Sequence, residues 1–190
     1  MLINATLRCL AEGSVERLSV RAISAEAGVS VGLINHHYAS KDALVADAYR
    51  RAAGNLLDGL AQAVALAPAD PRSRLDAFFQ DSFSPRVLDP KLLKIWTAFW
   101  TLADRSAHVQ AAHERTYGEY RDLLERLLSD LAHNTVPADL RLAAIGLSAL
   151  LDGLWLEWCL NPTTFTPEEG IRLCRLWTDA LLARLGEPSR

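Results

Sequence analysis

The stretch SVRAISAEAGVSVGLINHHYASK, residues 19–41, is the part of the sequence that decides the fold. Val20 and Ile23 are spaced as on one face of a short first helix. Gly28 suits the left-handed backbone that commonly ends a helix, and a second short helix over Val31–Tyr38 is expected after it. Two short helices joined by a tight turn predict a helix-turn-helix, whose second helix enters the major groove of DNA. An ordinary helical hairpin within a bundle has the same spacing.

A longer string, AGVSVGLINHHYASKDAL at residues 27–44, resembles the helix-turn-helix signature of TetR-type transcriptional regulators. In that family an Ala-Gly-Val-Ser turn leads into a recognition helix that ends in aromatic residues. A Lys-acidic-x-Leu sequence then starts a long fourth helix. The corresponding residues in this chain are Ala27–Ser30, His37–Tyr38 and Lys41–Leu44.

This resemblance implies a ligand-responsive repressor with two domains. Residues 1–50 would form a three-helix DNA-binding domain, and residues 51–190 a helical domain for ligand binding and dimerisation. A homodimer would place two recognition helices on the halves of a near-palindromic operator. In the family a short basic arm precedes the first helix. This chain starts almost at that helix, so the phosphate contacts of such an arm are expected either to be missing or to belong to residues trimmed from the chain.

The second helix of the motif supplies the candidates for reading bases. Small and short polar side chains on its outer face suit the major groove, and the amide of Asn35 matches N6 and N7 of adenine. Asn35 stands where the family often has tyrosine, which leaves the base preference open. The expected base-edge residues are Val31, Gly32, Asn35 and His36. By match to the family pattern, the expected phosphate contacts are Ser19, Ser30, His37 and Lys41.

Composition and periodicity predict an all-α chain. Half of the 190 residues are apolar, which suffices for a sizeable core, and no run of alternating β-branched residues predicts a strand. Ser19, Ser30 and Ser40 are expected N-caps, and Thr166 with Glu169 has the spacing of a capping box. We expect about nine helices, over residues 2–11, 20–27, 31–38, 40–67, 73–83, 91–103, 106–132, 137–160 and 167–185.

The net charge of −3 argues against a non-specific nucleic-acid binder but is compatible with a sequence-specific one. Residues 1–50 balance five acidic side chains with five basic ones, which are Arg8, Arg17, Arg21, Lys41 and Arg50. Electrostatic affinity for DNA must therefore come from the local placement of charge and from the doubling of phosphate contacts in a dimer.

The run ALLDGLWLEWCL, residues 149–160, holds a carboxylate among apolar residues. Asp152 should have a partner or reach water, because burying an unpaired charge is costly. One interpretation is a dimer seam, in which Gly153 lets the partner copy approach and the leucines pack against it. The other interpretation is that Asp152, Glu157 or both hold a cationic ligand.

The segments KIWTAFW (residues 94–100) and ALLDGLWL (residues 149–156) look like the C-terminal domain of the BetI group, repressors of glycine-betaine synthesis that respond to choline. A quaternary ammonium binds over aromatic faces by cation–π attraction. The same aromatic spacing also fits plain core packing, or a pocket for an unrelated hydrophobic or aromatic effector. The candidate ligand-binding residues are Trp96, Phe99, Trp100, Tyr117, Tyr120, Asp152, Trp155 and Trp158.

Other classes of function lack a supporting motif. The sequence has no HExxH, no GxSxG and no phosphate-binding Gly-rich loop, so we expect neither an enzyme nor a cofactor. Cys9, Cys159 and Cys174 form no CxxC pair or zinc pattern, so we expect buried thiols and no metal. Without a signal peptide or an uncharged apolar run of membrane-spanning length, a cytoplasmic protein is expected. A helical interaction module without DNA binding would require the helix-turn-helix to be degenerate.

Overall fold

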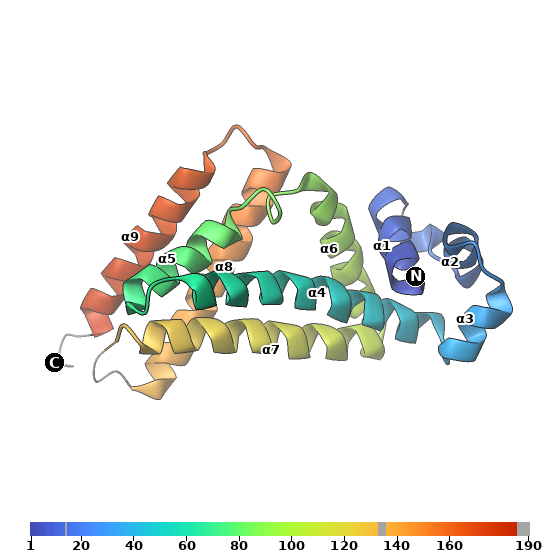
Figure 1. Ribbon diagram of the computed structural model, residues 1–190, viewed down its shortest axis with the longest axis horizontal. Coiled ribbons are helices and arrows are strands. Elements are labelled where there is room, and N and C mark those ends of the chain that lie inside the picture. Colours follow the sequence, from blue (N-terminus) through green and yellow to red (C-terminus); the bar gives the residue numbers. More distant parts are fainter. Residues whose placement is uncertain (14, 133–135, 186–190) are drawn as a thin grey trace. The chain divides into compact units, whose positions relative to one another are not determined.

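The computed structural model describes residues 1–13, 15–132 and 136–185 (Figure 1). Within these ranges all regular secondary structure is helical, so the predicted all-α fold is confirmed. A short 3-10 turn, η1 (Val15–Arg17), follows the first helix. The nine α-helices of the described residues are α1 (Leu2–Glu12), α2 (Val20–Ala27), α3 (Val31–His37), α4 (Lys41–Leu66), α5 (Pro71–Ser82), α6 (Pro90–Ala103), α7 (Ala107–Ser129), α8 (Pro137–Leu160) and α9 (Pro167–Leu185).

The predicted residues fix the ends of α2 and α3. Ser19 Oγ accepts the backbone N–H of Ala22 at 3.1 Å, and Ser30 Oγ accepts that of Leu33 at 3.2 Å. Each serine thus satisfies one of the orphan N–H groups of its helix. Gly28 has φ 66° and ψ 33°, the left-handed conformation that ends α2. The turn between the two helices is therefore held by local hydrogen bonds and backbone geometry.

The predicted capping box at the start of α9 is confirmed. The backbone N–H of Thr166 donates to Glu169 Oε2 at 2.7 Å, and the N–H of Glu169 donates to Thr166 Oγ1 at 3.3 Å. Ser40 Oγ accepts the N–H of Ala43 at 3.1 Å in the same way. α8 begins at Pro137, because proline is tolerated in the first turn, where its missing N–H costs no helical bond.

Several helix ends differ from the expectation by one to three residues, and three of them are informative. α3 stops at His37, and Tyr38 is extended with φ −131° and ψ 127°. α5 begins at Pro71, two residues earlier than expected, because the Asp70 carboxylate accepts the backbone N–H of Ser73 at 2.8 Å and caps the helix there. α7 ends at Ser129, three residues early.

Packing divides the chain into two compact units. The expected division into a DNA-binding domain and a ligand-binding domain near residue 50 stays a prediction. The N-terminal unit consists of residues 1–55 and 90–117, and the C-terminal unit of residues 56–89 and 118–190. α4 and α7 each contribute one segment to both units. Residues 90–117 belong with the helix-turn-helix because their apolar side chains complete its hydrophobic core.

The core of the N-terminal unit is built around Tyr49 of α4, whose side chain is 0% exposed. Its ring packs against Phe99 and Trp96 of α6, with ring centroids 4.8 and 5.5 Å away. Its hydroxyl lies 2.8 Å from Nδ1 of His113 on α7, which satisfies a buried polar group. Ile23 of α2 is buried in the same cluster, so one core supports α1, α2, α4, α6 and the start of α7.

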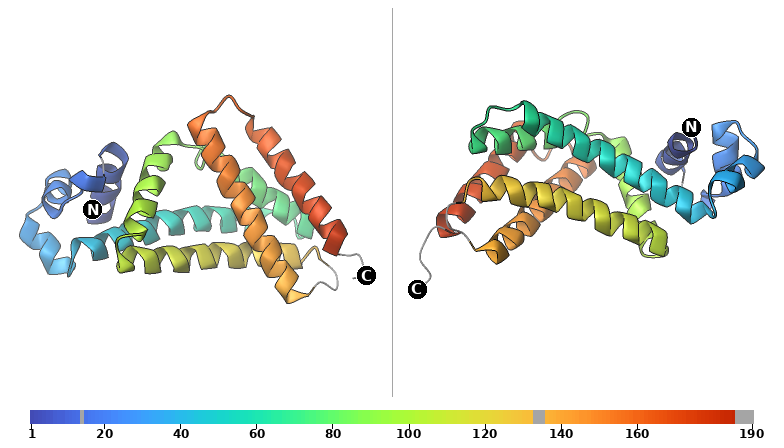
Figure 2. Two further views of the ribbon diagram at one scale, coloured as in Figure 1. Left: turned by 180° about the vertical axis from the view of Figure 1, so that it is seen from behind. Right: turned by 60° about the horizontal axis from the view of Figure 1, so that its bottom comes forward.

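The C-terminal unit packs α5, α8 and α9 with the second segments of α4 and α7 around buried phenylalanines and leucines. α8 and α9 run in opposite directions from a shared turn (Figure 2). The Arg175 guanidinium of α9 donates to the Asp76 carboxylate of α5 at 2.8 Å. Cys159 and Cys174 are buried free thiols, as expected, while Cys9 is half-buried.

α8 and α9 also carry large apolar side chains that the protomer leaves uncovered. Ile145 is 37% exposed, and Gly153 on the same helix has nothing within 4 Å of the position of an added Cβ. Exposed apolar helix faces commonly mark interfaces between proteins. The uncovered large side chains are Leu142, Ile145 and Leu160 on α8, and Leu173 and Leu176 on α9.

Among the residues that the structure describes, one helix is long and apolar enough to cross a membrane by length and composition alone. It is the segment Asp139–Leu160 of α8, with a mean hydropathy of 1.4. Arg141, Asp152 and Glu157 lie within this segment. One face of the segment packs into the core of the C-terminal unit, as the apolar helix of a soluble protein also does.

Candidate nucleic-acid interface

α3 is held by one apolar anchor and exposes the rest of its surface. Ile34 is 1% exposed and packs into the core of the N-terminal unit. The other two large apolar side chains of α3 are exposed, Val31 by 36% and Leu33 by 37%. All four residues predicted to reach base edges, Val31, Gly32, Asn35 and His36, are exposed on this helix.

The four predicted phosphate contacts occupy different environments. Ser19, Ser30 and His37 are exposed. The oxygen of each serine accepts a backbone N–H, which leaves its hydroxyl hydrogen available to donate to a phosphate. Lys41 is half-buried, and its Nζ donates to the carbonyl oxygen of Leu18 at 3.4 Å. The remaining hydrogens of its ammonium group are the ones that could contact DNA.

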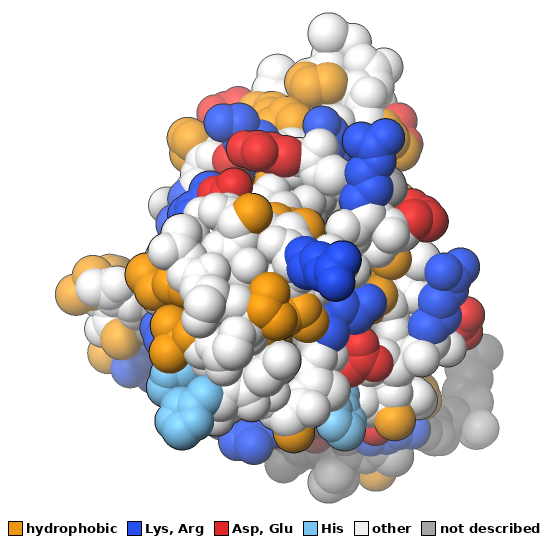
Figure 3. Space-filling model, turned by 90° about the vertical axis from the view of Figure 1, so that its right-hand side faces the viewer, with side chains coloured by type: hydrophobic (Ala, Val, Ile, Leu, Met, Phe, Trp, Pro, Cys, Tyr) orange, Lys and Arg blue, Asp and Glu red, His pale blue; other side chains and the backbone are white. Residues whose placement is uncertain are grey.

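Two of the basic side chains of the N-terminal unit form ion pairs with acidic ones. Arg8 pairs with Glu26, and Arg50 pairs with Asp47. Arg17 and Arg21 are exposed close to the helix-turn-helix. Figure 3 shows the side of the molecule that lies to the right in Figure 1. On this side Lys and Arg side chains are interspersed with acidic and apolar ones, without a continuous basic patch. Such a surface favours specific contacts over broad electrostatic attraction.

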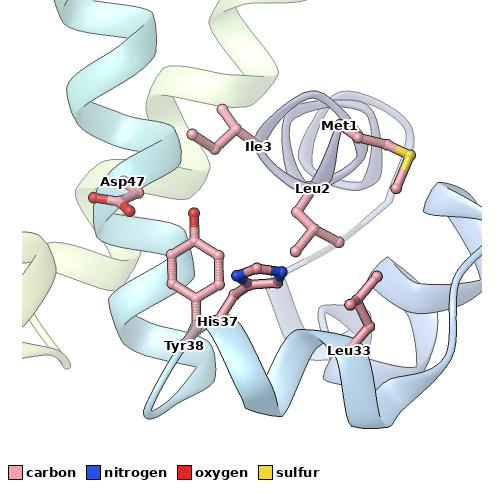
Figure 4. Close-up of a pocket in the computed structure, with 7 residues that line it drawn as sticks. All are labelled: Met1, Leu2, Ile3, Leu33, His37, Tyr38 and Asp47. Carbon is pink, nitrogen blue, oxygen red and sulfur yellow. The ribbon is translucent and has the colours of Figure 1, made fainter.

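A depression of about 410 Å³ lies beside the recognition helix (Figure 4). The Tyr38 side chain points toward Asp47 across it. Burial, followed by the charge and hydrogen bond of Asp47, raises the pKa of Tyr38 above its ordinary value, so this phenol is a neutral polar group at the rim. The lining residues are Met1, Leu2, Ile3, Leu33, His37, Tyr38 and Asp47.

The predicted ligand-binding residues are divided between the two units. Phe99 is fully buried in the N-terminal unit, where its ring lies 5.9 Å from that of Trp96. In the C-terminal unit the indole N–H of Trp155 donates to the carbonyl of Val87 at 2.9 Å, and Asp152 is half-buried. These contacts describe packing, and the aromatic cage stays a prediction. Trp96, Phe99, Trp100 and Tyr117 belong to the N-terminal unit; Tyr120, Asp152, Trp155 and Trp158 belong to the C-terminal unit.

Leu33 is an exposed residue of this surface that the sequence pattern did not select. The apolar pattern indicates Ile34 for the inward side of α3, and the structure adds that its neighbour Leu33 is 37% exposed. The signal available in the sequence is that adjacent residues of a helix point about 100° apart, so Leu33 points away from the side that Ile34 occupies.

Both halves of the chain match family models. Residues 2–48 match the model of bacterial regulatory proteins of the tetR family, and residues 71–183 match the C-terminal model of BetI-type transcriptional repressors. The chain belongs to the TetR family. The resemblances to TetR-type regulators and to the BetI group are thereby confirmed.

Individual TetR-family relatives cover nearly the whole chain. The HTH-type transcriptional regulator BetI of Burkholderia thailandensis is 31% identical over 96% of this chain and 92% of its own length. A crystal structure from Pseudomonas aeruginosa PAO1, assigned as a transcriptional regulator, is 51% identical, with a TM-score of 0.90 over 96% of this chain and 88% of its own. A regulator from Saccharomonospora viridis in complex with choline shares the fold at 18% identity, with a TM-score of 0.75 over 94% of this chain and 93% of its own.

Membership of the TetR family decides between the classes considered from the sequence. The relatives are transcriptional regulators and not enzymes, so the protein is a soluble DNA-binding regulator of the repressor type. An interaction module without DNA binding is not supported, because the helix-turn-helix is intact in its turn, its caps and its exposed recognition helix.

Proposed function

We propose that this TetR-family protein binds a near-palindromic operator in the cytoplasm as a homodimer and leaves it when a small effector binds. The exposed outer face of α3 carries the proposal, because a helix held only by Ile34 presents the rest of its side chains to a groove. Asn35 would pair with an adenine through its amide. Ser19, Ser30, His37 and Lys41 would contact phosphates and set the register of α3.

The dimer would form through the uncovered apolar faces of α8 and α9. Two copies of such a helix pair make a four-helix interface, in which the partner copy would cover Leu142, Ile145 and Leu173. Gly153 would mark the closest approach, since no neighbour within the protomer occupies its Cβ position.

The effector would be a small cation such as choline, recognised by aromatic faces and by the carboxylate of Asp152. The BetI-type match of residues 71–183 supports this choice. Choline bound to the Saccharomonospora viridis regulator is compatible with it, although that relative establishes only the fold. A hydrophobic or aromatic effector is the competing possibility, because many of the candidate side chains are apolar rings.

Release from DNA requires that the effector prefer the released conformation, since a ligand with equal affinity for both states shifts no equilibrium. α4 is a continuous helix with segments in both packing units. A tilt of α4 would therefore change the position of the helix-turn-helix and the spacing of the two recognition helices.

DNA recognition can be tested with a duplex that the protein selects from a random pool. Asn35→Ala should weaken binding to the selected duplex by about 1–3 kcal/mol and non-specific binding much less. Lys41→Ala should weaken both equally and lower the salt slope by about one unit, because it removes a phosphate contact. Equal losses on all duplexes in the Asn35 variant would refute base reading. No binding to any duplex at low salt would refute the DNA-binding function.

The effector can be tested by thermal stability in the presence of choline, betaine aldehyde and larger apolar cations. A ligand at about 100 times its dissociation constant adds roughly 2.7 kcal/mol to the free energy of unfolding. Trp155→Ala should abolish a shift seen with choline. A shift with apolar compounds and none with any cation would favour the competing effector class.

A further inference from the structure

The recognition helix α3 carries no lysine, arginine, aspartate or glutamate. Its sequence is VGLINHH, and its two exposed aliphatic side chains are Val31 and Leu33. Arginine and lysine are the side chains that most often read guanine, through O6 and N7. α3 has neither, so it lacks the side chains that read guanine bidentately, and the donors that it does carry are the amide of Asn35 and the imidazoles of His36 and His37.

The aliphatic side chains on α3 match a different feature of the major groove. The C5 methyl group of thymine is the only apolar group that a base pair presents there, and it is read by apolar contact. In the free protein the exposed parts of Val31 and Leu33 contact water, and bound DNA would cover them. Burial of an apolar group in such a contact is favourable in proportion to the area removed from water.

Gly32 lies between these two side chains, and the fold leaves space for a larger residue at its position. A Cβ there would meet only Ser30 Oγ, at 3.8 Å, which is ordinary contact. Glycine lowers helix stability and is kept where a backbone must approach another molecule closely. A close approach of α3 at Gly32 would bring the flanking side chains of Val31 and Leu33 within reach of base edges.

We propose that α3 reads thymine methyl groups through Leu33 and Val31, and that each half-site has an A·T core in which Asn35 pairs with an adenine. This inference rests on the proposed DNA binding and names the class of base pair that the same surface selects. It also assigns Leu33, which lines the side of the depression in Figure 4, as a specificity-determining residue.

The test removes single methyl groups from DNA. A duplex selected by the protein from a random pool is resynthesised with deoxyuridine in place of thymidine, one symmetric pair of positions at a time. Burial of one carbon group contributes about 0.8 kcal/mol. Loss of one thymine methyl in one half-site should therefore weaken binding about fourfold. Pairs replaced in both half-sites should therefore weaken binding by about 15-fold.

Variants of the protein assign each methyl group to a side chain. In Leu33→Ala, deoxyuridine should no longer weaken binding at the thymine that Leu33 contacts, but should still weaken it at the thymine that Val31 contacts. Val31→Ala should show the reverse. Leu66→Ala is the matched control, since Leu66 is a 79% exposed leucine on α4, and it should keep every penalty. The salt slope should stay unchanged in all three variants, because none removes a charge.

Two results would overturn the inference while leaving DNA binding intact. One is a selected half-site with a G·C core whose affinity does not respond to deoxyuridine. The other is a deoxyuridine penalty that persists unchanged in both Leu33→Ala and Val31→Ala, since the methyl groups would then contact another part of the protein. Failure to select any duplex would instead contradict the proposed function itself.

Discussion

Gly32 is the residue at which protein stability and DNA affinity should respond in opposite directions. Gly32→Ala should raise the free energy of unfolding by about 0.5–1 kcal/mol, because alanine loses less backbone entropy in a helix. The same methyl group should weaken binding to the selected duplex, because it stands where α3 approaches DNA. Thermal melting and a binding titration measure the two effects.

Gly54→Ala is the matched control for this variant. Gly54 lies in α4, and nothing lies within 4 Å of its Cβ position. It should show the gain in stability without a loss of affinity. A Gly32→Ala protein that binds the selected duplex as tightly as the wild type would contradict a close approach of DNA at this residue.

The buried thiols should be chemically inert in the folded protein. Burial raises the pKa of Cys174 from 9.0 to about 12, and burial together with the charge of Asp89 raises that of Cys159 to about 11. The thiolate is the reactive form, so at pH 8 a disulfide reagent should label neither residue until the protein is unfolded. The stabilisation from the neutral thiols is complete below pH 9 and is lost as pH rises toward 12, because only the unfolded state ionises in that window. Rapid labelling of Cys174 in the native protein would contradict its burial.

Residues with local roles could be predicted from the sequence, and those whose role depends on packing could not. Ser19, Ser30 and Gly28 were predictable because a cap depends only on its own few neighbours. The exposure of Leu33 depends on which side of α3 the rest of the core occupies. Whether the aromatic candidates form a ligand site depends on long-range packing as well, and that part of the site stays a prediction.

At the scale of the element, the capping box of α9 is a measurable contribution to stability. Thr166→Ala removes the acceptor for the N–H of Glu169 and should lower the free energy of unfolding by about 1 kcal/mol. Chemical denaturation measures the loss. Thr101→Ala is the control, since this exposed threonine of α6 bonds only the carbonyl of Thr97 in its own helix. Equal effects of the two substitutions would argue against a capping contribution.

Elements with a chemical start signal were predictable to the residue. Pro137 and the Thr166 box mark the starts of α8 and α9, and both helices have the predicted bounds. α7 has no proline or glycine at its end, and its apolar pattern continues through Leu131, so the expected helix ran three residues too far. The apolar pattern of the sequence therefore predicts that a segment is helical better than it predicts where the helix ends.

At the scale of the whole molecule, the apolar face of α8 should control assembly. Ile145→Asp introduces a charge at a position that is 37% exposed in the protomer, so folding should be preserved. In the proposed dimer the same charge would be buried without a partner, which costs several kcal/mol. Sedimentation should show a monomer, and affinity for the two-half-site duplex should fall sharply.

Leu66→Asp provides the control for a charge at an exposed leucine outside this face. It should remain dimeric and keep its affinity for DNA. An Ile145→Asp protein that sediments as a dimer would place the interface elsewhere.

The division of the chain into packing units could not be predicted from the sequence. Helix-turn-helix residues and α6 are separated by about fifty positions, and the contacts between α1 and α6 leave no periodic signal in either segment. The sequence motif ends near Leu44, so the expected boundary followed the motif, whereas the core extends to Phe99 and Ala112.

The inclusion of residues 90–117 in the N-terminal unit has a consequence for building hybrid regulators. A chimera joined at residue 50 would transplant the helix-turn-helix without Phe99, Leu102 and Val109, which pack in the same core as Tyr49. The transplanted residues would then pack against the α6 of another protein, whose side chains do not match the transplanted core. Recombination between relatives should therefore tolerate exchange of α3 alone, and should tolerate a larger transplant only when the donor also supplies residues 90–117.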